Sequence, residues 1–231
     1  MVKSVESGDT MAVCLVTGAN RGIGLEYCRQ LKQRGDTVIA VCRSLTPELK
    51  ALDVQVEEGI DITDDDSVAA LVKRLQGTQI DILINNAGIL ERVTLDDLDI
   101  ESILKQFEVN AVGPLCLTRA LLPNLKSGSK VAIMTSRMGS IGDNTSGGSY
   151  GYRMSKAALS MAGKSLSHDL KEHGIAVGIL HPGLVSTRMT GFTNSGITPA
   201  QAVEGLLARI DELNLENTGT FWHSNGEVLP W

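Results

Sequence analysis

The stretch "TGANRGIG", residues Thr17 to Gly24, gives the clearest indication of the fold of this chain. It follows the apolar run "MAVCLVTG" (11–18), which is typical of a buried strand, and opens the amphipathic stretch "GIGLEYCRQLKQRG" (22–35), which is typical of a helix. A strand that passes through a glycine-rich turn into a helix begins a βαβ unit, and the N-terminus of such a helix attracts phosphate. Taken alone, the turn could also be only a tight connection between strand and helix.

The rest of the chain repeats this alternation. A third strand is expected just before Asp61, and a last one in the closing stretch 218–231. Further apolar runs, nearly continuous as strands buried on both faces should be, lie at 36–43, 79–88, 129–136 and 174–183. Amphipathic helical stretches separate them, at 64–77 and 99–125. This order predicts an α/β protein with one Rossmann-type, doubly wound parallel sheet of about seven strands and helices on both faces.

The composition excludes several classes of function. The 231-residue chain has a net charge of −6 and no cluster of Lys or Arg, so it offers no electrostatic footprint to a nucleic acid. No apolar run reaches the roughly 18 residues that would cross a membrane. Four scattered cysteines fit buried side chains in a reducing cytoplasm, and the histidines lack metal-ligand spacing, so no metal site is expected. Residues 11–231 are expected to form a single domain behind a flexible N-terminal extension, 1–10.

The glycine turn has the position that a dinucleotide-binding fingerprint requires, after the first strand and at the start of the first helix. Its spacing is G-x-x-x-G-x-G, through Gly18, Gly22 and Gly24. At the end of the second strand, where an acid would hold the ribose of NAD, the chain has Arg43, and Arg21 lies within the turn. Two cations suit a 2′-phosphate, so NADP(H) is the expected cofactor, with NAD(H) as the alternative. The arginines could also be ordinary solvated surface charges.

Tyr152 and Lys156 are four residues apart in "SYGYRMSKAAL" (149–159) and therefore neighbours on one helix face. A cation about 4 Å from a phenol, at an effective dielectric of about 20, favours the phenolate by roughly 4 kcal/mol, or about three pKa units. This pairing predicts a tyrosine whose pKa the lysine lowers toward the range that suits general acid–base catalysis. Taken alone, such a pair is more often an ordinary part of a helix surface.

Two further side chains fit this chemistry. Ser136 ends the strand at 129–136, where its hydroxyl could stabilise a developing alkoxide, although a loop serine is often only a turn residue. Asn110 lies within a helix four residues before Pro114, which has no N–H to bond the Asn110 carbonyl, and Gly113 eases a kink. The freed carbonyl could hold a water near Lys156, or the bend could serve packing alone.

Five motifs now stand in one order: "TGANRGIG", "NNAG" (Asn85–Gly88), Asn110, Ser136 in "TSRMGS", and Tyr152-x-x-x-Lys156. In order and spacing they resemble the short-chain dehydrogenase/reductase family over about residues 12–187. The stretch "YGYRMSKAALSMAGKSLS" and the closing "LPW" look most like its C-factor and small carbonyl-reductase branch. The resemblance implies that Asn110, Ser136, Tyr152 and Lys156 are catalytic, with Asn110 in a proton relay.

The resemblance also implies a set of cofactor-binding positions. Asp61 would meet the adenine, Asn85, Ala87 and Gly88 would flank the adenosine ribose, and Lys156 would hold the nicotinamide ribose. The full set is Gly18, Asn20, Arg21, Gly22, Ile23, Gly24, Arg43, Asp61, Ile62, Asn86, Ala87, Gly88, Tyr152, Lys156, Pro182, Gly183, Val185 and Thr187. His181, just before Pro182, is interpreted as a strand-end residue rather than a proton carrier.

The expected activity is NADP(H)-dependent reduction of small or aromatic aldehydes and ketones. Only about ten residues separate Thr187 from the next helix, so an open, shallow pocket is expected, with Met138, Ile141, Met189 and Phe192 as apolar walls or, alternatively, as core. A second hypothesis is a dinucleotide-binding signalling or interaction protein of the C-factor type with little turnover; the intact Ser-Tyr-Lys set favours an enzyme. The family usually assembles through its long fourth and fifth helices, which implies a homodimer or homotetramer.

Overall fold

The computed structural model describes residues 11–231, and the extension predicted at 1–10 lies outside them. A seven-stranded parallel sheet runs through the molecule in the order β3-β2-β1-β4-β5-β6-β7. Its strands are β1 (Val13–Thr17), β2 (Thr37–Cys42), β3 (Gln55–Glu58), β4 (Ile80–Asn85), β5 (Leu125–Met134), β6 (Ala176–His181) and β7 (Phe221–His223). The predicted Rossmann-type α/β fold is confirmed.

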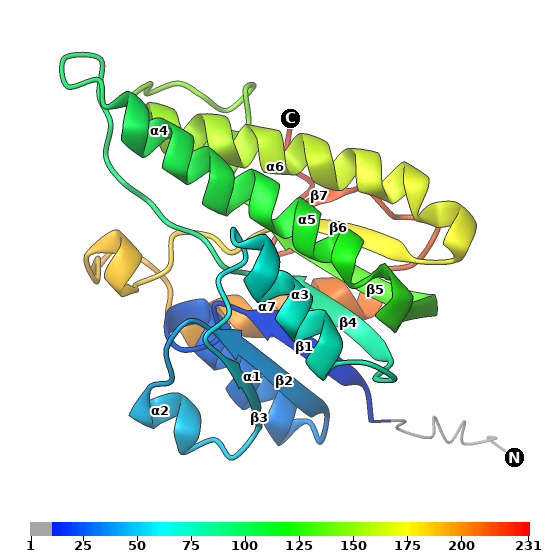
Figure 1. Ribbon diagram of the computed structural model, residues 1–231. Coiled ribbons are helices and arrows are strands. Elements are labelled where there is room, and N and C mark those ends of the chain that lie inside the picture. Colours follow the sequence, from blue (N-terminus) through cyan, green and yellow to red (C-terminus); the bar gives the residue numbers. More distant parts are fainter. Residues whose placement is uncertain (1–10) are drawn as a thin grey trace, which may run out of the picture.

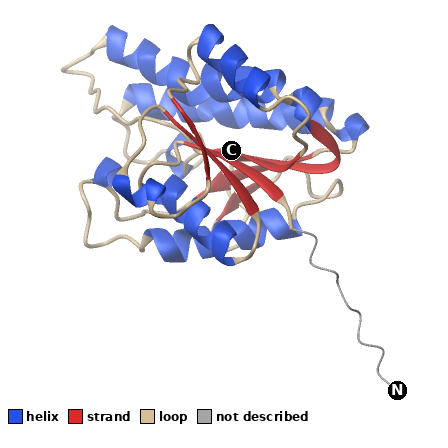
Figure 2. Ribbon diagram, turned by 60° about the horizontal axis from the view of Figure 1, so that its bottom comes forward, coloured by secondary structure: helices blue, strands red, loops and turns tan. Residues whose placement is uncertain are grey.

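Helices cover both faces of this sheet (Figures 1 and 2). They are α1 (Gly22–Gln33), α2 (Pro47–Lys50), α3 (Asp65–Arg74), α4 (Ile100–Phe107), α5 (Gly113–Ala120), α6 (Tyr150–Asp169) and α7 (Pro199–Glu212). One hydrophobic core joins α1 and α7 to the sheet, and a second joins α3, α5 and α6 to its other face. This two-sided burial is the reason that the strand sequences are apolar without alternation.

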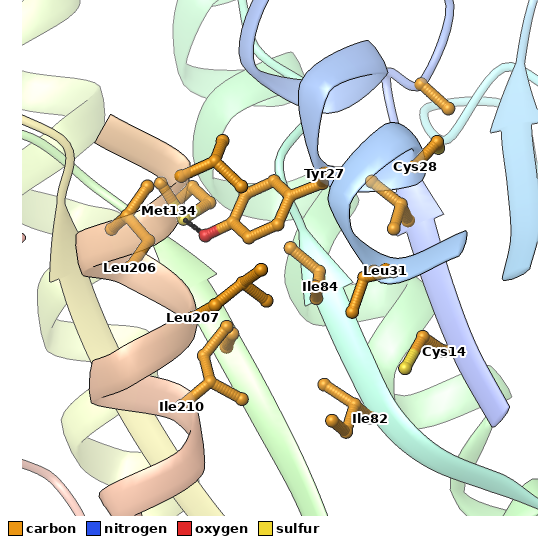
Figure 3. Close-up of a cluster of buried hydrophobic side chains, with 14 of the residues drawn as sticks. Cys14, Tyr27, Cys28, Leu31, Ile82, Ile84, Met134, Leu206, Leu207 and Ile210 are labelled. Carbon is orange, nitrogen blue, oxygen red and sulfur yellow. Dashed lines mark hydrogen bonds between the residues drawn. The ribbon is translucent and has the colours of Figure 1, made fainter. Parts of the chain in front are cut away.

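The core under α1 and α7 is centred on Tyr27 of α1, which is completely buried (Figure 3). Its ring lies between Ile84 of β4 and the α7 side chains Leu206 and Leu207, and its hydroxyl contacts the Met134 sulfur at 3.3 Å. The otherwise apolar surroundings give the hydroxyl this partner in place of water, as burial of a phenol requires.

The long helix expected at 99–125 is interrupted. Its central turn, Glu108–Val112, is a π-helix, between α4 and α5, and the N–H of Gly113 bonds the carbonyl of Glu108, five residues back. Pro114 supplies no N–H to the ordinary helical ladder, so the backbone widens by one residue at the point where the sequence predicted a kink. β5 then begins at Leu125, earlier than the apolar run suggested.

The prediction that the cysteines are buried holds for three of the four. Cys14, Cys28 and Cys42 are buried as expected, but Cys116 is exposed, because it lies on the outer face of α5. No helix within residues 11–231 is both long and apolar enough to cross a membrane. No group of three His, Cys, Asp or Glu side chains in this part of the chain has a metal-binding arrangement.

Strand order reverses beside β1, where β2 lies on one side and β4 on the other. All strands are parallel, so the turns after β1, β4, β5 and β6 meet at one edge of the sheet. In doubly wound folds this reversal leaves a crevice beyond the carboxyl ends of the strands, where ligands bind. The glycine turn and the loops after β4, β5 and β6, which carry the sequence motifs, therefore lie along this edge.

Candidate active site

The glycine turn after β1 is shaped for close approach. Gly18 and Gly22 have φ of +64° and +54°, in the left-handed region that favours glycine. A Cβ on Gly24 would overlap the carbonyl oxygen of Gly18, so α1 can leave the strand this closely only with glycine there. Arg21 at the N-cap gives α1 no side-chain hydrogen bond, and Ile23 is half-buried in its first turn. The helix end keeps N–H groups that can bind an anion.

The turn after β4 packs directly on the glycine turn. The Asn86 side-chain amide donates to the Thr17 carbonyl at 2.9 Å, and the Thr17 hydroxyl accepts hydrogen bonds of 3.0 Å from the Asn86 and Ala87 N–H groups. Asn85, which was expected to flank the adenosine ribose, has a buried side chain that donates to Thr118 in the helix layer at 2.9 Å. Side chains alternate along a strand, so Asn86, one residue later, faces the turn instead.

The loop after β2 holds the expected cations. Arg43 and Arg21 are both exposed. Arg43 lies 3.7 Å from the Asp61 carboxylate, which follows β3 and also accepts hydrogen bonds from Thr63. Burial alone would raise the pKa of Asp61, but the Thr63 hydrogen bonds and the Arg43 charge outweigh it and hold the pKa below its usual value. The carboxylate is thus ionised and keeps Arg43 near the sheet edge.

Two more predicted residues lie at this end of the crevice. The Asn20 amide donates to the Ser44 carbonyl at 3.0 Å, and the Thr46 hydroxyl donates to the Asn20 carbonyl at 2.9 Å, which ties the glycine turn to the loop carrying Arg43. Ile62 is buried and packs on Gly113, where an added Cβ would lie 3.1 Å from the Ile62 side chain.

Ser136, Tyr152 and Lys156 come together at the end of β5. The Lys156 Nζ lies 5.8 Å from the centre of the Tyr152 ring and donates to the Met134 carbonyl at 2.8 Å. Ser136 lies near enough to the Tyr152 phenol to act on its pKa, and the Ser136 side-chain oxygen accepts from the Met138 N–H at 3.1 Å. Helix α6 is fixed to the strand end because the Thr135 hydroxyl donates to the Lys156 carbonyl at 3.0 Å. The i,i+4 spacing thus puts phenol and amine beside each other, as predicted.

The acidity of this pair differs from the sequence argument. Burial raises the pKa of Tyr152 to about 12, and the nearby Ser136 hydroxyl only partly opposes this. Burial also lowers the pKa of Lys156 to about 8. Desolvation disfavours the charged form of each group. The predicted fall in the pKa of Tyr152 is therefore wrong, because burial outweighs the attraction between the Lys156 ammonium and the phenolate.

Asn110 is completely buried in the π-turn. Its side-chain oxygen accepts from the Ile89 N–H at 2.8 Å, and its amide donates to the Ile89 carbonyl at 2.8 Å and to Ser155 at 3.0 Å. A Cβ on Gly88 would lie 3.1 Å from the Asn110 side-chain oxygen and 3.6 Å from the Lys156 Nζ. The Asn110 side chain therefore holds the loop beside Lys156, and a water on its main-chain carbonyl stays a prediction.

The loop after β6 returns over the glycine turn. Gly183, after Pro182, has φ of +86°, Val185 is buried, and Thr187 lies 3.6 Å from the Cβ position of Gly22. His181 ends β6 as expected; burial lowers its pKa to about 3, so it is neutral at physiological pH. Three of the proposed pocket walls, Ile141, Met189 and Phe192, are 81%, 45% and 66% exposed, so the core alternative is wrong for them.

Four residues that hold the site together were not predicted from the sequence. Thr17, Thr135 and Ser155 tie strand ends and helix to the loops, and Gln106 bonds the loop after β4. Thr17 stands inside the quoted glycine motif, and Gln106 lies one turn before Asn110, so both had a positional signal. Thr135 and Ser155 had none, because hydroxyl residues are common in such positions.

Comparison with known proteins agrees with this geometry. The sequence profile of the family described as short chain dehydrogenase matches residues 12–198. The 1-hydroxy-2-glutathionyl-2-methyl-3-butene dehydrogenase of Rhodococcus sp. (strain AD45) is 45% identical over 96% of this chain and 100% of its own length. The C-signal protein of Myxococcus xanthus is 46% identical over 66% of this chain and 93% of its own.

Solved structures give the same result. The NADPH-bound carbonyl reductase from chicken fatty liver superposes with a TM-score of 0.86 at 31% identity, covering 96% of this chain and 99% of that one. The carbonyl reductase Sniffer of D. melanogaster superposes with a TM-score of 0.89 at 30% identity, covering 96% and 100%. The strand reversal, the glycine turn and the Ser136–Tyr152–Lys156 cluster thus have a common explanation, which is that this chain belongs to the short-chain dehydrogenase/reductase family of oxidoreductases.

Proposed function

We propose that this protein uses NADP(H) to reduce small or aromatic aldehydes and ketones to alcohols. The observation that carries the proposal is the buried cluster of Ser136, Tyr152 and Lys156 at the edge of the sheet where the glycine turn also lies. A dinucleotide-binding module without turnover has no need of a phenol, a hydroxyl and an amine gathered at one point.

The residues at the sheet edge fit an NADP(H) molecule. The helix end without a side-chain cap, at Arg21, suits the pyrophosphate, and Gly18 leaves the backbone open to it. Arg43, kept near the sheet edge by Asp61, and the exposed Arg21 suit a 2′-phosphate. Two relatives of known structure, the chicken enzyme and a Pseudomonas aeruginosa carbonyl reductase, were solved with NADPH and NADP respectively. NADPH would supply the hydride.

The cluster then provides the proton. The pKa of Tyr152, at about 12, keeps its phenol protonated at neutral pH, so it has a proton to give to a carbonyl oxygen that gains charge. The Ser136 hydroxyl donates a hydrogen bond to the same oxygen and stabilises the alkoxide character. Lys156, whose pKa is about 8, is mostly protonated at pH 7 and favours the phenolate that Tyr152 leaves behind.

The test is NADPH oxidation, followed by its absorbance, against a panel of carbonyl compounds. Because the Rhodococcus relative's name specifies an alcohol that carries a glutathionyl group, the panel includes such thioethers beside neutral aldehydes and ketones. Tyr152→Phe removes the proton donor but keeps the ring, so turnover is expected to fall at least about 1,000-fold while NADPH still protects the protein from thermal unfolding. Full activity of this variant would refute the mechanism.

A second candidate is a signalling or interaction protein with little turnover. The 46% identity to the Myxococcus C-signal protein favours it. The same assay separates the two functions, because a wild-type protein that binds NADPH but turns over none of the panel would support the second candidate.

We infer further that the chain forms a homodimer or homotetramer. Helices α4 and α5 run beside α6 on one outer face of the molecule (Figure 1). These three helices expose several large apolar side chains: Ile100, Leu104, Phe107, Leu115, Met154 and Met161. Exposed apolar side chains that gather on one helical layer often mark a contact with another protein surface. The cytoplasmic location stays a prediction from the cysteines.

A further inference from the structure

Helix α6, which carries Tyr152, begins without a cap of its own. Ser149 at the N-cap has φ of +48° and makes no side-chain cap hydrogen bond. The first helical N–H, that of Tyr150, donates instead to the carbonyl of Val93 at 3.1 Å. Val93 is buried and belongs to the loop 86–99 between β4 and α4. The start of α6 therefore depends on where this loop holds its backbone.

A closed ring of hydrogen bonds fixes the loop two residues before Val93. The Glu91 N–H donates to the Gln106 side-chain oxygen at 3.0 Å, and the Gln106 amide donates to the Ser102 hydroxyl at 3.2 Å. The Ser102 hydroxyl donates in turn to the Glu91 carboxylate at 2.5 Å. The completely buried amide of Gln106 therefore binds the Glu91 backbone directly and the Glu91 carboxylate by way of Ser102.

Gln106 also lies directly against the first turn of α6. A Cβ on Gly151 would come within 2.5 Å of the Gln106 amide nitrogen and 3.2 Å of the Ile103 Cα. No larger residue fits between Tyr150 and Tyr152 unless the amide moves. Gln106 therefore meets α6 at Gly151, one turn before the point where Asn110 meets it at Ser155.

Two buried amide side chains thus connect the loop 86–99 to α6, and each connection is called a rung below. Asn110 joins Ile89 of the loop to Ser155, and Gln106, one helical turn earlier, joins Glu91 of the loop to Gly151. Tyr152 lies on α6 between the two rungs. A polar amide buried this completely is costly unless all its partners are kept, so the geometry of the rung is strongly determined.

We propose that Gln106 is a positioning residue for Tyr152, acting through the loop that caps α6. The proposal rests on the proposed function, in which Tyr152 is the proton donor. Without the Gln106 amide, the Glu91 backbone loses its acceptor, Val93 is no longer held under the Tyr150 N–H, and the first turn of α6 frays. A phenol displaced by about 1 Å transfers its proton poorly.

The experiment compares Gln106→Met, which keeps the side-chain length without its polar atoms, with Lys105→Met on the exposed face of the same helix. Gln106→Met is expected to lower kcat for a carbonyl substrate about tenfold, with the NADPH Kd within about twofold of wild type. The deuterium isotope effect from 4-deuterated NADPH is expected to rise, because the chemical step becomes slower. Lys105→Met should leave kcat, Kd and isotope effect unchanged.

Two further variants guard against misfolding of Gln106→Met. Ser102→Ala opens the same ring by removing one hydroxyl, and Gly151→Ala displaces the amide from the side of α6. Both variants are expected to lower kcat and raise the isotope effect, as Gln106→Met does. The change should be smaller than that of Gln106→Met for Ser102→Ala and similar to it for Gly151→Ala. An unchanged kcat with a lower Tm in the variants that fold would overturn the proposal, as would equal losses of kcat and NADPH affinity.

The outcome for Tyr152→Phe separates this proposal from the one on which it rests. Loss of turnover in Tyr152→Phe together with full turnover in Gln106→Met refutes the positioning role alone. Full turnover in Tyr152→Phe refutes the proposed function, whatever Gln106→Met does.

Discussion

The Lys156 amine lies 5.8 Å from the centre of the Tyr152 ring, and the two residues are only 5% and 8% exposed. Burial removes water from the amine and from the phenol, and this favours the neutral form of each group. The pair is thus set to keep a proton on Tyr152 until an oxygen able to take it arrives. This arrangement has consequences for stability as well as for chemistry.

Lys156 should make stability depend on pH in the alkaline range. Its pKa is about 8 when folded, against about 10.4 in an unfolded chain. Between these values the unfolded chain binds a proton that the folded protein does not, so stability rises with pH, by at most about 3 kcal/mol. Urea unfolding at pH 7 to 10 should show this rise in wild type relative to Lys156→Met. Parallel curves for the two proteins would contradict the lowered pKa.

Arg43 should decide the cofactor. Replacing it by Asp puts a carboxylate where a 2′-phosphate would lie and frees Asp61 of its partner 3.7 Å away. The ratio of kcat/KM for NADPH to that for NADH is expected to fall about 100-fold or more. The substitution removes a cation that attracts the 2′-phosphate and adds a carboxylate that repels it. Lys50→Asp, the same charge change on an exposed residue of α2, is the control. An unchanged ratio in Arg43→Asp would mean that the arginine is only a solvated charge.

Gly24 should tolerate no side chain. Gly24→Ala would force a methyl group into the Gly18 carbonyl and the Asn86 amide, at a cost of about 1–3 kcal/mol or more. The expected result is a lower Tm and no thermal stabilisation by NADPH. Gly35→Ala is the control, because its φ of +92° strains alanine but a Cβ there meets nothing within 4 Å. It should lower Tm slightly and leave NADPH binding intact. Equal effects of the two variants on Tm and NADPH binding would contradict the steric overlap at Gly24.

The apolar face of α4 and α5 should carry the assembly. Leu104 of α4 is 64% exposed, and a carboxylate at this position would be unpaired when buried in an interface. Light scattering is expected to give a multiple of the 24.6 kDa chain mass for wild type and the single mass for Leu104→Glu. The same substitution at Leu215, exposed away from this face, should leave the mass unchanged. A wild-type mass of one chain would refute the assembly.

The fold was predictable because its signals are local. Strands buried on both faces require continuous apolar runs, and the turn through Gly18, Gly22 and Gly24 requires glycine for its backbone angles and close contacts. The side-by-side placement of Tyr152 and Lys156 is likewise local, because helical geometry brings residues four apart together.

Other features depend on chain segments that are distant in sequence. Asn85 and Asn86 are adjacent in sequence, yet one faces Thr118 in the helix layer and the other the glycine turn, which only the placement of β4 decides. Gln106 gains its role from contacts with Glu91 and Gly151, at separations of 15 and 45 residues.

Local sequence is sufficient to predict the succession of strands and helices along the chain, the glycine turn and the spacing of phenol and amine, since each follows from backbone geometry over a few residues. The acidity of those two groups, in contrast, depends on how the whole chain packs. A pKa depends on how much water the surrounding chain removes and on which dipoles replace it, and around Tyr152 and Lys156 those neighbours come from the end of β5 and the loop after β4.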